Sequence, residues 1–228
     1  MKYVSLFDII GPVMVGPSSS HTAGAVRIGQ IAWAIYGGIA PEVKITFYGS
    51  FAHTWRGHGT GLAVVAGLLG FKTYDERISQ AFTEAQKLGM HVTICTSEEE
   101  MSHPNTARIE LSNPEKGFKV ELVGASVGGG SVEIIELNGY KILLDGDAKN
   151  IIIMHNDVSG SIAMITSVFA KYKLNISHME VSRKVKRGIA IMLVETDEDY
   201  SLNMIHDLEQ LPIVTQVIHM KKIGSQEN

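Results

Sequence analysis

The stretch Gly16-Pro17-Ser18-Ser19-Ser20-His21-Thr22-Ala23-Gly24 lies between an apolar run over residues 9–15 and a helical pattern over residues 25–36. Serine and threonine are preferred at helix N-termini because their hydroxyls cap backbone N–H groups that have no partner in the first turn. Those same N–H groups can bind an anion such as a carboxylate. The stretch therefore predicts the start of a helix, and it leaves open whether that start is only capped or also binds a ligand.

Length and composition indicate a globular chain of one or two domains. The 228 residues are 45% hydrophobic and carry a net charge of −4, which is enough to build a core and does not favour nucleic acid as the main partner. The longest basic cluster, residues 183–187, is interpreted as a hairpin turn in solvent. No apolar stretch reaches about 18 residues and no signal-peptide pattern is found, so we expect a cytoplasmic protein without membrane association.

The chain has a single cysteine, Cys95, in a predicted apolar strand, where we expect an inert core residue. One cysteine excludes an internal disulfide and a cluster held by cysteines of this chain alone. A metal site formed by His21, His53 and His58 is possible in principle. However, His53 and His58 are five residues apart, and this spacing does not place two ligands on one helix face as a spacing of four would. We therefore expect no metal site in this chain.

Residues 1–147 are predicted to form an α/β domain with a mixed sheet. A short helix or strand is expected over residues 3–10, and the residues 62–69 should form a helix buried on nearly all sides. The Asn138-Gly139 pair is a strong hairpin signal. The other expected elements are helices over residues 25–36 and 75–88 and strands over residues 43–49, 91–96, 106–111, 119–123, 132–137 and 140–144.

Residues 145–149 are polar and turn-like, and we place the domain boundary there, with a second domain over residues 150–224. Its pattern predicts strand, helix, strand, strand, helix and strand, which is the ferredoxin-like βαββαβ plan and gives the chain an α+β fold class. The expected ranges are 151–154, 161–172, 176–183, 189–195, 202–211 and 214–220. The side chains expected to face inward from its helices are Ile162, Ile165, Val168, Phe169, Tyr172, Leu202, Ile205 and Leu208.

His21 and His58 are candidate catalytic residues because each lies beside hydroxyls and glycines at a predicted helix start. Histidine titrates near pH 7 and serves as a general acid or base. We infer that the two loops converge; the alternative is a pair of hydrogen-bonded structural histidines. A nucleophilic pair of Ser20 and His21 finds little support, because adjacency does not make a triad and no G-x-S-x-G elbow is present.

Two further motifs each have a structural alternative. The glycine-rich residues 124–130 lack the ending of a phosphate-binding loop and open a strand, so we expect a bulge or a close backbone approach. Trp55 and Arg56 form either a docking surface or a partly buried tryptophan covered by an arginine.

Pro17-Ser18-Ser19-Ser20-His21-Thr22, followed by His58-Gly59-Thr60-Gly61-Leu62-Ala63, resembles the iron–sulfur-dependent L-serine dehydratases, and more narrowly the beta chain of their two-chain form. The first domain is also similar to the allosteric substrate-binding domain of some phosphoglycerate dehydrogenases. The second domain resembles an ACT domain, a small regulatory module that often binds amino acids.

The resemblance implies conversion of L-serine to pyruvate and ammonia with a [4Fe–4S] cluster whose open iron site acts as a Lewis acid. Family enzymes hold the cluster with three cysteines of the alpha chain, so this chain is expected to be the beta subunit that completes the active site and to be inactive alone. The resemblance implies catalytic roles for His21 and His58. It implies substrate binding by Ser18, Ser19, Ser20, Thr22, Gly59 and Thr60.

In the ACT-like domain, His155, Asn156 and Asp157 are expected to form or border a regulatory amino-acid site at the start of a helix. The domain is also expected to form a homodimer, and dimerisation with an empty site is the alternative interpretation. The rival function for the whole chain is a stand-alone amino-acid sensor without a catalytic partner. The Ser-Ser-Ser-His-Thr stretch would then be only an anion pocket.

Overall fold

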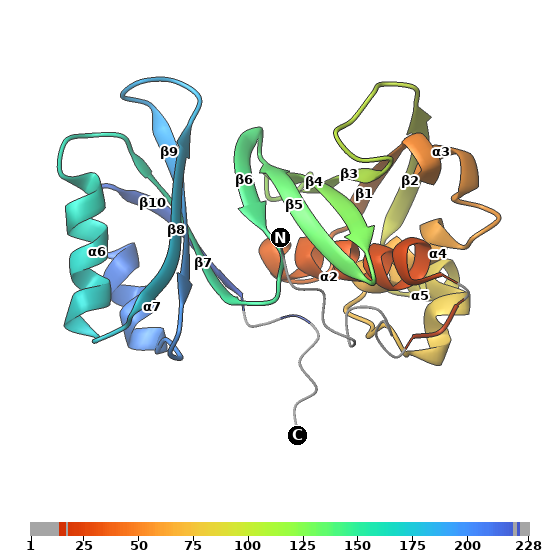
Figure 1. The fold of residues 1–228 in the computed structure, drawn as a ribbon, viewed down its shortest axis with the longest axis horizontal. Coiled ribbons are helices and arrows are strands. Elements are labelled where there is room, and N and C mark those ends of the chain that lie inside the picture. Colours follow the sequence, from red (N-terminus) through yellow and green to blue (C-terminus); the bar gives the residue numbers. More distant parts are fainter. Residues whose placement is uncertain (1–13, 17, 221–222, 224–228) are drawn as a thin grey trace. The chain divides into compact units, whose positions relative to one another are not determined.

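The computed structural model describes residues 14–16, 18–220 and 223. The chain divides into two compact units, residues 1–139 and 140–228, which are coloured from red to green and from green to blue (Figure 1). Each described unit combines helices with strands, which confirms the predicted α+β class. The element expected over residues 3–10 lies outside the described residues.

A six-stranded mixed sheet has the order β2-β1-β3-β4-β5-β6. Strands β1 and β2 run parallel, and β1–β3, β3–β4 and β4–β5 pair antiparallel, as the mixed-sheet prediction required. Asn138 and Gly139 both have positive φ, 49° and 74°, as the tight turn between β5 and β6 requires. The strand bounds are β1 Glu42–Tyr48, β2 His91–Ser97, β3 Asn105–Asn113, β4 Phe118–Gly128, β5 Ser131–Leu137 and β6 Tyr140–Leu144.

The helices of the first unit include two that pack against each other, α2 (Ala25–Tyr36) and α4 (Thr60–Leu68), both drawn in red to orange (Figure 1). Eight of the nine residues of α4 are buried, as predicted for this small apolar helix. Gly29 and Gly67 permit the close approach, because a Cβ on Gly67 would overlap the carbonyl oxygen of Val26. The other helices are η1 Ser19–Gly24, α3 Gly49–Thr54, η2 Glu76–Gln80 and α5 Ala81–Lys87.

One face of the first sheet carries the core and the other carries charge. Val43, Ile45 and Phe47 of β1 are buried, as expected of alternate residues on a covered face. Lys44, between two of them in sequence, pairs at 2.9 Å with Glu110 on the opposite face. The core therefore lies on the face that α2 and α4 cover.

Three predictions for the first unit are corrected. The helix expected over residues 75–88 is a 3-10 helix, η2, followed by α5, and Asp75 caps the start of η2 by accepting a hydrogen bond from the Arg77 N–H. The helix α3, which immediately follows β1, was not predicted. Cys95 is only partly buried, because β2 is the edge strand of the sheet and its side chains have a partner strand on one side only.

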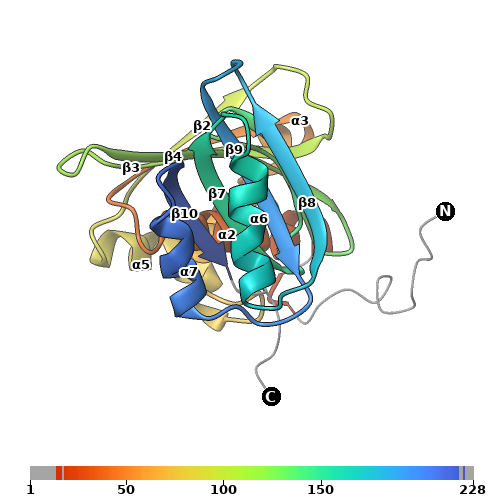
Figure 2. The same cartoon turned by 90° about the vertical axis from the view of Figure 1, so that its left-hand side faces the viewer.

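After β6, the second unit continues in the order β7-α6-β8-β9-α7-β10, and the antiparallel sheet of these later strands has the order β10-β7-β9-β8. Figure 2 shows α6 and α7 on one face of this sheet. The predicted βαββαβ plan is confirmed. The bounds are β7 Lys149–Asn156, α6 Ser161–Lys171, β8 Ile176–Arg183, β9 Ile189–Thr196, α7 Leu202–Glu209 and β10 Val214–Met220.

The core of the second unit includes most of the predicted inward residues, among them Ile165, Phe169 and Leu208. Ile162 and Leu202 were predicted inward but are 45% and 75% exposed. Each lies in the first turn of its helix, at or beyond the margin of the stripe that the sheet covers. Among the described residues, no helix is long and apolar enough to cross a membrane.

Candidate active site

The Ser-Ser-Ser-His-Thr stretch begins a helix, as predicted, and most of it is itself helical because it forms the π-helix η1 directly before α2. Ser18 is the N-cap of the π-helix η1, and its Oγ accepts a hydrogen bond of 3.2 Å from the backbone N–H of His21. The helix buries Thr22 and Gly24 while Ser18 and His21 stay partly accessible. Gly24 lies directly against Ser126 of β4, where a Cβ would overlap the hydroxyl.

Hydroxyl groups lie at both ring nitrogens of His21. Its Nε2 lies 3.2 Å from Ser50 Oγ, and its Nδ1 lies 3.1 Å from Ser20 Oγ and 3.5 Å from Ser18 Oγ. A hydroxyl can donate or accept, so this arrangement suits either tautomer of the ring. The ring makes a T-shaped contact with Phe51, with centroids 5.2 Å apart. Sequence and geometry therefore place His21 where a proton can enter or leave at either nitrogen.

His58 joins this group from the turn between α3 and α4. Its ring centroid lies 5.1 Å from that of His21, and its backbone N–H donates to the carbonyl of Thr54 at 2.9 Å. Gly59 follows with φ of 70°, which turns the chain into α4. The inferred convergence of the two loops is confirmed for these two histidines.

The electrostatics of the pair favour a neutral His21. Partial burial lowers the pKa of His21 from its ordinary value, and a positive charge on His58 lowers that pKa further. Desolvation and a like charge both disfavour the protonated form of a histidine. His21 is therefore in its basic form at neutral pH.

Three buried hydroxyls near this site have no hydrogen-bond partner among the described residues: those of Thr22, Thr60 and Ser126. Thr22 lies on η1, Thr60 is the first residue of α4, and Ser126 packs against Gly24. A buried polar group without a partner is costly, so such groups are uncommon in native proteins. Each of these three hydroxyls can therefore still form a hydrogen bond with a further group.

The predicted substrate-binding residues are thus partly assembled. Ser18 and Ser20 contact the His21 ring, Thr22 is buried on η1 beside His21, and Thr60 is buried at the start of α4, two residues after His58. Ser19 lies on η1 and Gly59 is the N-cap of α4. Sequence reasoning missed Ser50, whose only signal is a hydroxyl directly after a strand that ends in glycine.

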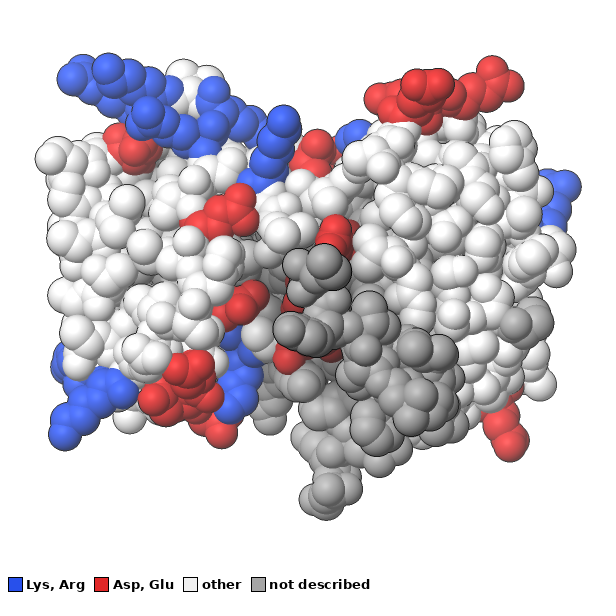
Figure 3. Space-filling view, viewed as in Figure 1, with Lys and Arg blue, Asp and Glu red and all other residues white. Residues whose placement is uncertain are grey.

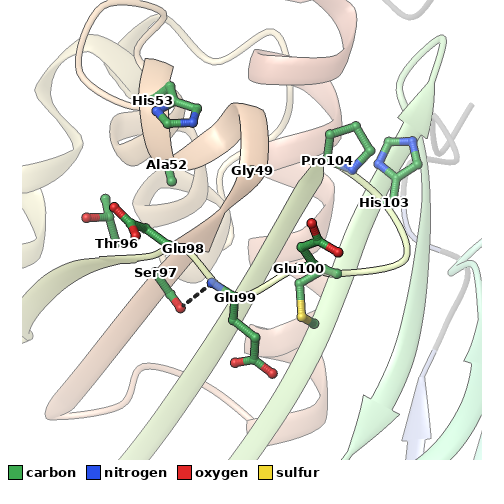
Figure 4. A pocket seen from close by; sticks show the side chains of 11 residues that line it. Gly49, Ala52, His53, Thr96, Ser97, Glu98, Glu99, Glu100, His103 and Pro104 are labelled. Carbon is green, nitrogen blue, oxygen red and sulfur yellow. Dashed lines mark hydrogen bonds between the residues drawn. The ribbon is translucent and has the colours of Figure 1, made fainter.

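A cavity of about 600 Å³ opens on another side of α3. Figure 4 shows His53 and the side chains of Glu98, Glu99 and Glu100 around it, on the loop that follows β2. In the space-filling view an acidic cluster appears in red on the first unit (Figure 3). Among residues 14–16, 18–220 and 223, no group of three His, Cys, Asp or Glu side chains could hold a metal ion.

The residues predicted to be regulatory differ from His21 in the groups that they contact. Asp157 Oδ2 accepts a hydrogen bond of 2.6 Å from Arg183 and one of 3.0 Å from the backbone N–H of Arg187. These contacts, the Arg187 N–H first, lower the pKa of Asp157 from its ordinary value. The basic cluster of residues 183–187, blue at the top of the second unit in Figure 3, is therefore not only a solvent-exposed turn. Its Arg183 side chain forms an ion pair with Asp157.

The side chains beside Asp157 differ in exposure. His155 is buried, with Nδ1 3.0 Å from the carbonyl oxygen of Asn156 and Nε2 without a partner in the described part of the chain. Asn156 is exposed. A hollow of about 380 Å³ lies against Asp157, Ser159 and Arg183.

The two remaining motifs make the contacts expected of their structural interpretations. Strand pairing shifts register between Val123 and Gly124 and again between Ser126 and Gly128, which confirms the predicted bulge. A Cβ on Gly124 would lie 2.8 Å from Ile134, which confirms the close approach. Arg56 lies over the ring of Trp55 at 4.8 Å, which supports the interpretation of a partly buried tryptophan covered by an arginine.

Comparison with known proteins gives three findings. Residues 5–100 match the family described as serine dehydratase beta chain. The chain is 47% identical over 217 residues to the probable L-serine dehydratase beta chain of Bacillus subtilis, covering 95% of this chain and 98% of that one. It is 36% identical over 199 residues to the L-serine dehydratase beta chain of Peptoniphilus asaccharolyticus, covering 87% and 89%.

A search of solved structures matches part of the chain to the ACT domain of a GTP pyrophosphokinase of Chlorobium tepidum. The match covers 35% of this chain and 92% of that domain, at 20% identity and a TM-score of 0.27.

Proposed function

Since this chain belongs to the family of L-serine dehydratase beta chains, we propose that it is the beta subunit of a [4Fe–4S]-dependent enzyme that converts L-serine to pyruvate and ammonia. In this proposal the subunit completes the active site of a separate alpha chain in the cytoplasm and is inactive alone. The observation that supports the proposal most is the ring contact between His21 and His58, with hydroxyls at both nitrogens of His21.

The residues of this chain do not fit an iron–sulfur cluster. Clusters of this kind are held by several cysteine thiolates, and the chain has only Cys95, which lies on edge strand β2. We propose that the cluster is held by the alpha chain, and that the contribution of this subunit is made by groups that bind, orient and exchange protons.

Removal of water from L-serine requires loss of the α-proton and departure of the hydroxyl as water. A neutral His21 can accept a proton at a nitrogen, and His58 lies close enough to share or repel the resulting charge. The hydroxyls of Ser18 and Ser20 lie at the Nδ1 atom of the same His21 ring. We propose that the unpartnered hydroxyls of Thr22 and Thr60, with Ser19 and the turn at Gly59, help to bind the polar groups of the substrate.

We propose that residues 150–224 are an ACT domain that regulates the enzyme, preceded by a dehydratase beta domain over residues 1–147. The hollow beside Asp157, bordered by His155 and Asn156, is its proposed amino-acid site. A homodimer through this domain is supported by edge strand β8, where Met179 and Val181 are 40% and 39% exposed.

The test is anaerobic pyruvate release from L-serine, measured first with this chain alone and then with an alpha chain and a reconstituted cluster. Activity only in the mixture is the expected result. Activity in neither sample, with the cluster spectroscopically intact and the two chains in complex, would contradict the proposal. That outcome would favour the amino-acid sensor, which calorimetry with free amino acids would then examine.

A further inference from the structure

We propose that Ser50 is a positioning residue for the dehydratase reaction, which holds the ring of His21 through its Nε2 and keeps that nitrogen in a hydrogen bond as the ring changes protonation state. This inference rests on the proposed function of His21. It adds to the site a third segment, the start of α3, which the Ser-Ser-Ser-His-Thr stretch and the His58 loop do not contain.

The position of Ser50 is fixed by the turn that ends β1. Gly49 has φ of 51°, and a Cβ at this residue would lie 2.6 Å from the carbonyl oxygen of Pro104, so glycine is required on both counts. A bridge between Gly49 and Asn105 holds the turn against the start of β3. The turn therefore fixes the direction of the backbone after β1, and it places Ser50 as the second residue of α3.

The helix α3 is anchored on several sides, which makes Ser50 a fixed point. Thr54 Oγ1 donates a hydrogen bond of 2.6 Å to the carbonyl of Ser50. Phe51 is fully buried and packs edge-on against Phe47, with ring centroids 5.9 Å apart. The same Phe51 makes a T-shaped contact with the His21 ring, so adjacent residues of α3 contact His21 through an aromatic ring and a hydroxyl.

The chemistry of a hydroxyl suits this position. Ser50 Oγ can donate to an unprotonated Nε2 and can accept from an N–H at the same atom. A carboxylate here would stabilise the charged ring and hold the proton, whereas an apolar side chain would leave Nε2 without this partner. With hydroxyls at both nitrogens, the ring can gain or lose a proton without rotating.

The test compares Ser50→Ala with Ser97→Ala, a control that removes a partly buried hydroxyl from the end of β2, where it accepts from the Glu99 N–H. In the assembled enzyme, Ser50→Ala should lower kcat about tenfold with KM within about twofold, and Ser97→Ala should change neither. Ser50→Thr, which keeps the hydroxyl, should restore most of kcat.

A second measurement needs no catalytic partner. Nitrogen-15 chemical shifts of the His21 ring in the isolated full-length chain report which nitrogen carries the proton and how firmly the ring is held. Ser50→Ala and Ser50→Cys should move these shifts toward those of free histidine, while Ser97→Ala should not.

Unchanged ring shifts in Ser50→Ala, or an unchanged kcat in a folded and assembled variant, would overturn the inference. If Ser50→Ala does not fold, the Ser50→Cys variant decides in the same way. Absence of pyruvate from the wild-type mixture would instead contradict the proposed function, and the ring shifts would still test the contact between Ser50 and His21.

Discussion

The His21–His58 pair and the Asp157 loop are both polar sites beside helices, but their polar groups are satisfied differently. At His21 the ring nitrogens face the uncharged hydroxyls of Ser20 and Ser50. At Asp157 the carboxylate is held by the guanidinium of Arg183 and by a backbone N–H. The first site can change its charge without breaking an ion pair, whereas the second has its charge fixed.

This difference suits the two kinds of function that we propose for these sites. A general acid or base must gain and lose a proton near neutral pH, which hydroxyl partners permit. An ion-paired loop instead stays in one conformation until something competes for its partners. A ligand that binds at the Asp157 loop would therefore have to accept hydrogen bonds from Arg183 together with Asp157, or take the place of one of the two. Either event would couple ligand binding to a change in the conformation of the loop.

The largest expected effect comes from removing the titratable ring of the first site. His21→Ala should lower the activity of the assembled enzyme by about 10² or more, on the scale of a lost acid–base group. His53→Ala is the matched control, because His53 lies on α3 and lines the cavity near Glu98. Pyruvate release by both variants, with assembly checked by gel filtration, gives the comparison. Near-normal turnover in His21→Ala would remove His21 from the chemistry.

The next effect concerns the helix pair behind the first site. Gly67→Ala places a Cβ against the carbonyl oxygen of Val26, and that backbone cannot move without separating α2 from α4. We expect a loss of roughly 1–3 kcal/mol in the free energy of unfolding, the range seen for overpacked cores. Gly57→Ala is the control, because the nearest atom to its added Cβ is 4.0 Å away. Urea unfolding of both variants measures the difference, and equal midpoints would show that the helices pack more loosely than described.

The regular elements of this fold were readable from the sequence because local patterns decided them. Residues 25–36 end at Gly37, which takes a left-handed φ of 84°, and the Asn138-Gly139 turn adopts the positive φ values that the pair favours. Buried α4 followed from its composition of small and apolar residues. In these places propensity and tertiary packing favour the same structure.

The candidate site was predictable only in part, because its geometry depends on contacts between distant residues. The histidines stood out by residue type, and their convergence could be inferred. The contact between His21 and Ser50 spans 29 residues and depends on the turn at Gly49, which no periodicity predicts. Likewise, the basic turn was predicted to be exposed to solvent, because the hydrogen bond from Arg183 to Asp157 joins residues 26 positions apart and no local pattern indicates it.

A smaller effect tests the electrostatics of the histidine pair. His58→Gln should raise the pKa of His21, because it removes a positive charge that disfavours the protonated ring. The pKa should stay below the ordinary value near 6.5, since burial is the larger cause and remains. NMR titration of the His21 ring in the isolated chain measures the shift, with His53→Gln as the control. An unchanged pKa in His58→Gln would mean that the two rings do not interact in solution.

The smallest effect is expected at the Asp157 loop, because its ion pair is exposed and solvent screens it. A carboxyl whose pKa is lowered by folding contributes stability above its unfolded pKa, near 4, and loses it as the pH falls through the lowered value. Asp157→Asn should therefore be slightly less stable than wild type at pH 7, and the two should converge as the pH falls through the lowered pKa of Asp157.

Thermal unfolding between pH 2.5 and 7 measures this effect, with Glu99→Gln, an exposed carboxylate on the loop after β2, as the control. A kinetic measurement sharpens the comparison between the two sites. If Asp157→Asn changes the dependence of rate on L-serine but not the maximal rate, the ion-paired carboxylate of Asp157 serves regulation, whereas the ring of His21 serves catalysis. A difference in stability that does not shrink as the pH falls to 2.5 would show that Asp157 acts through packing instead of charge, and the contrast with His21 would then lose its electrostatic basis.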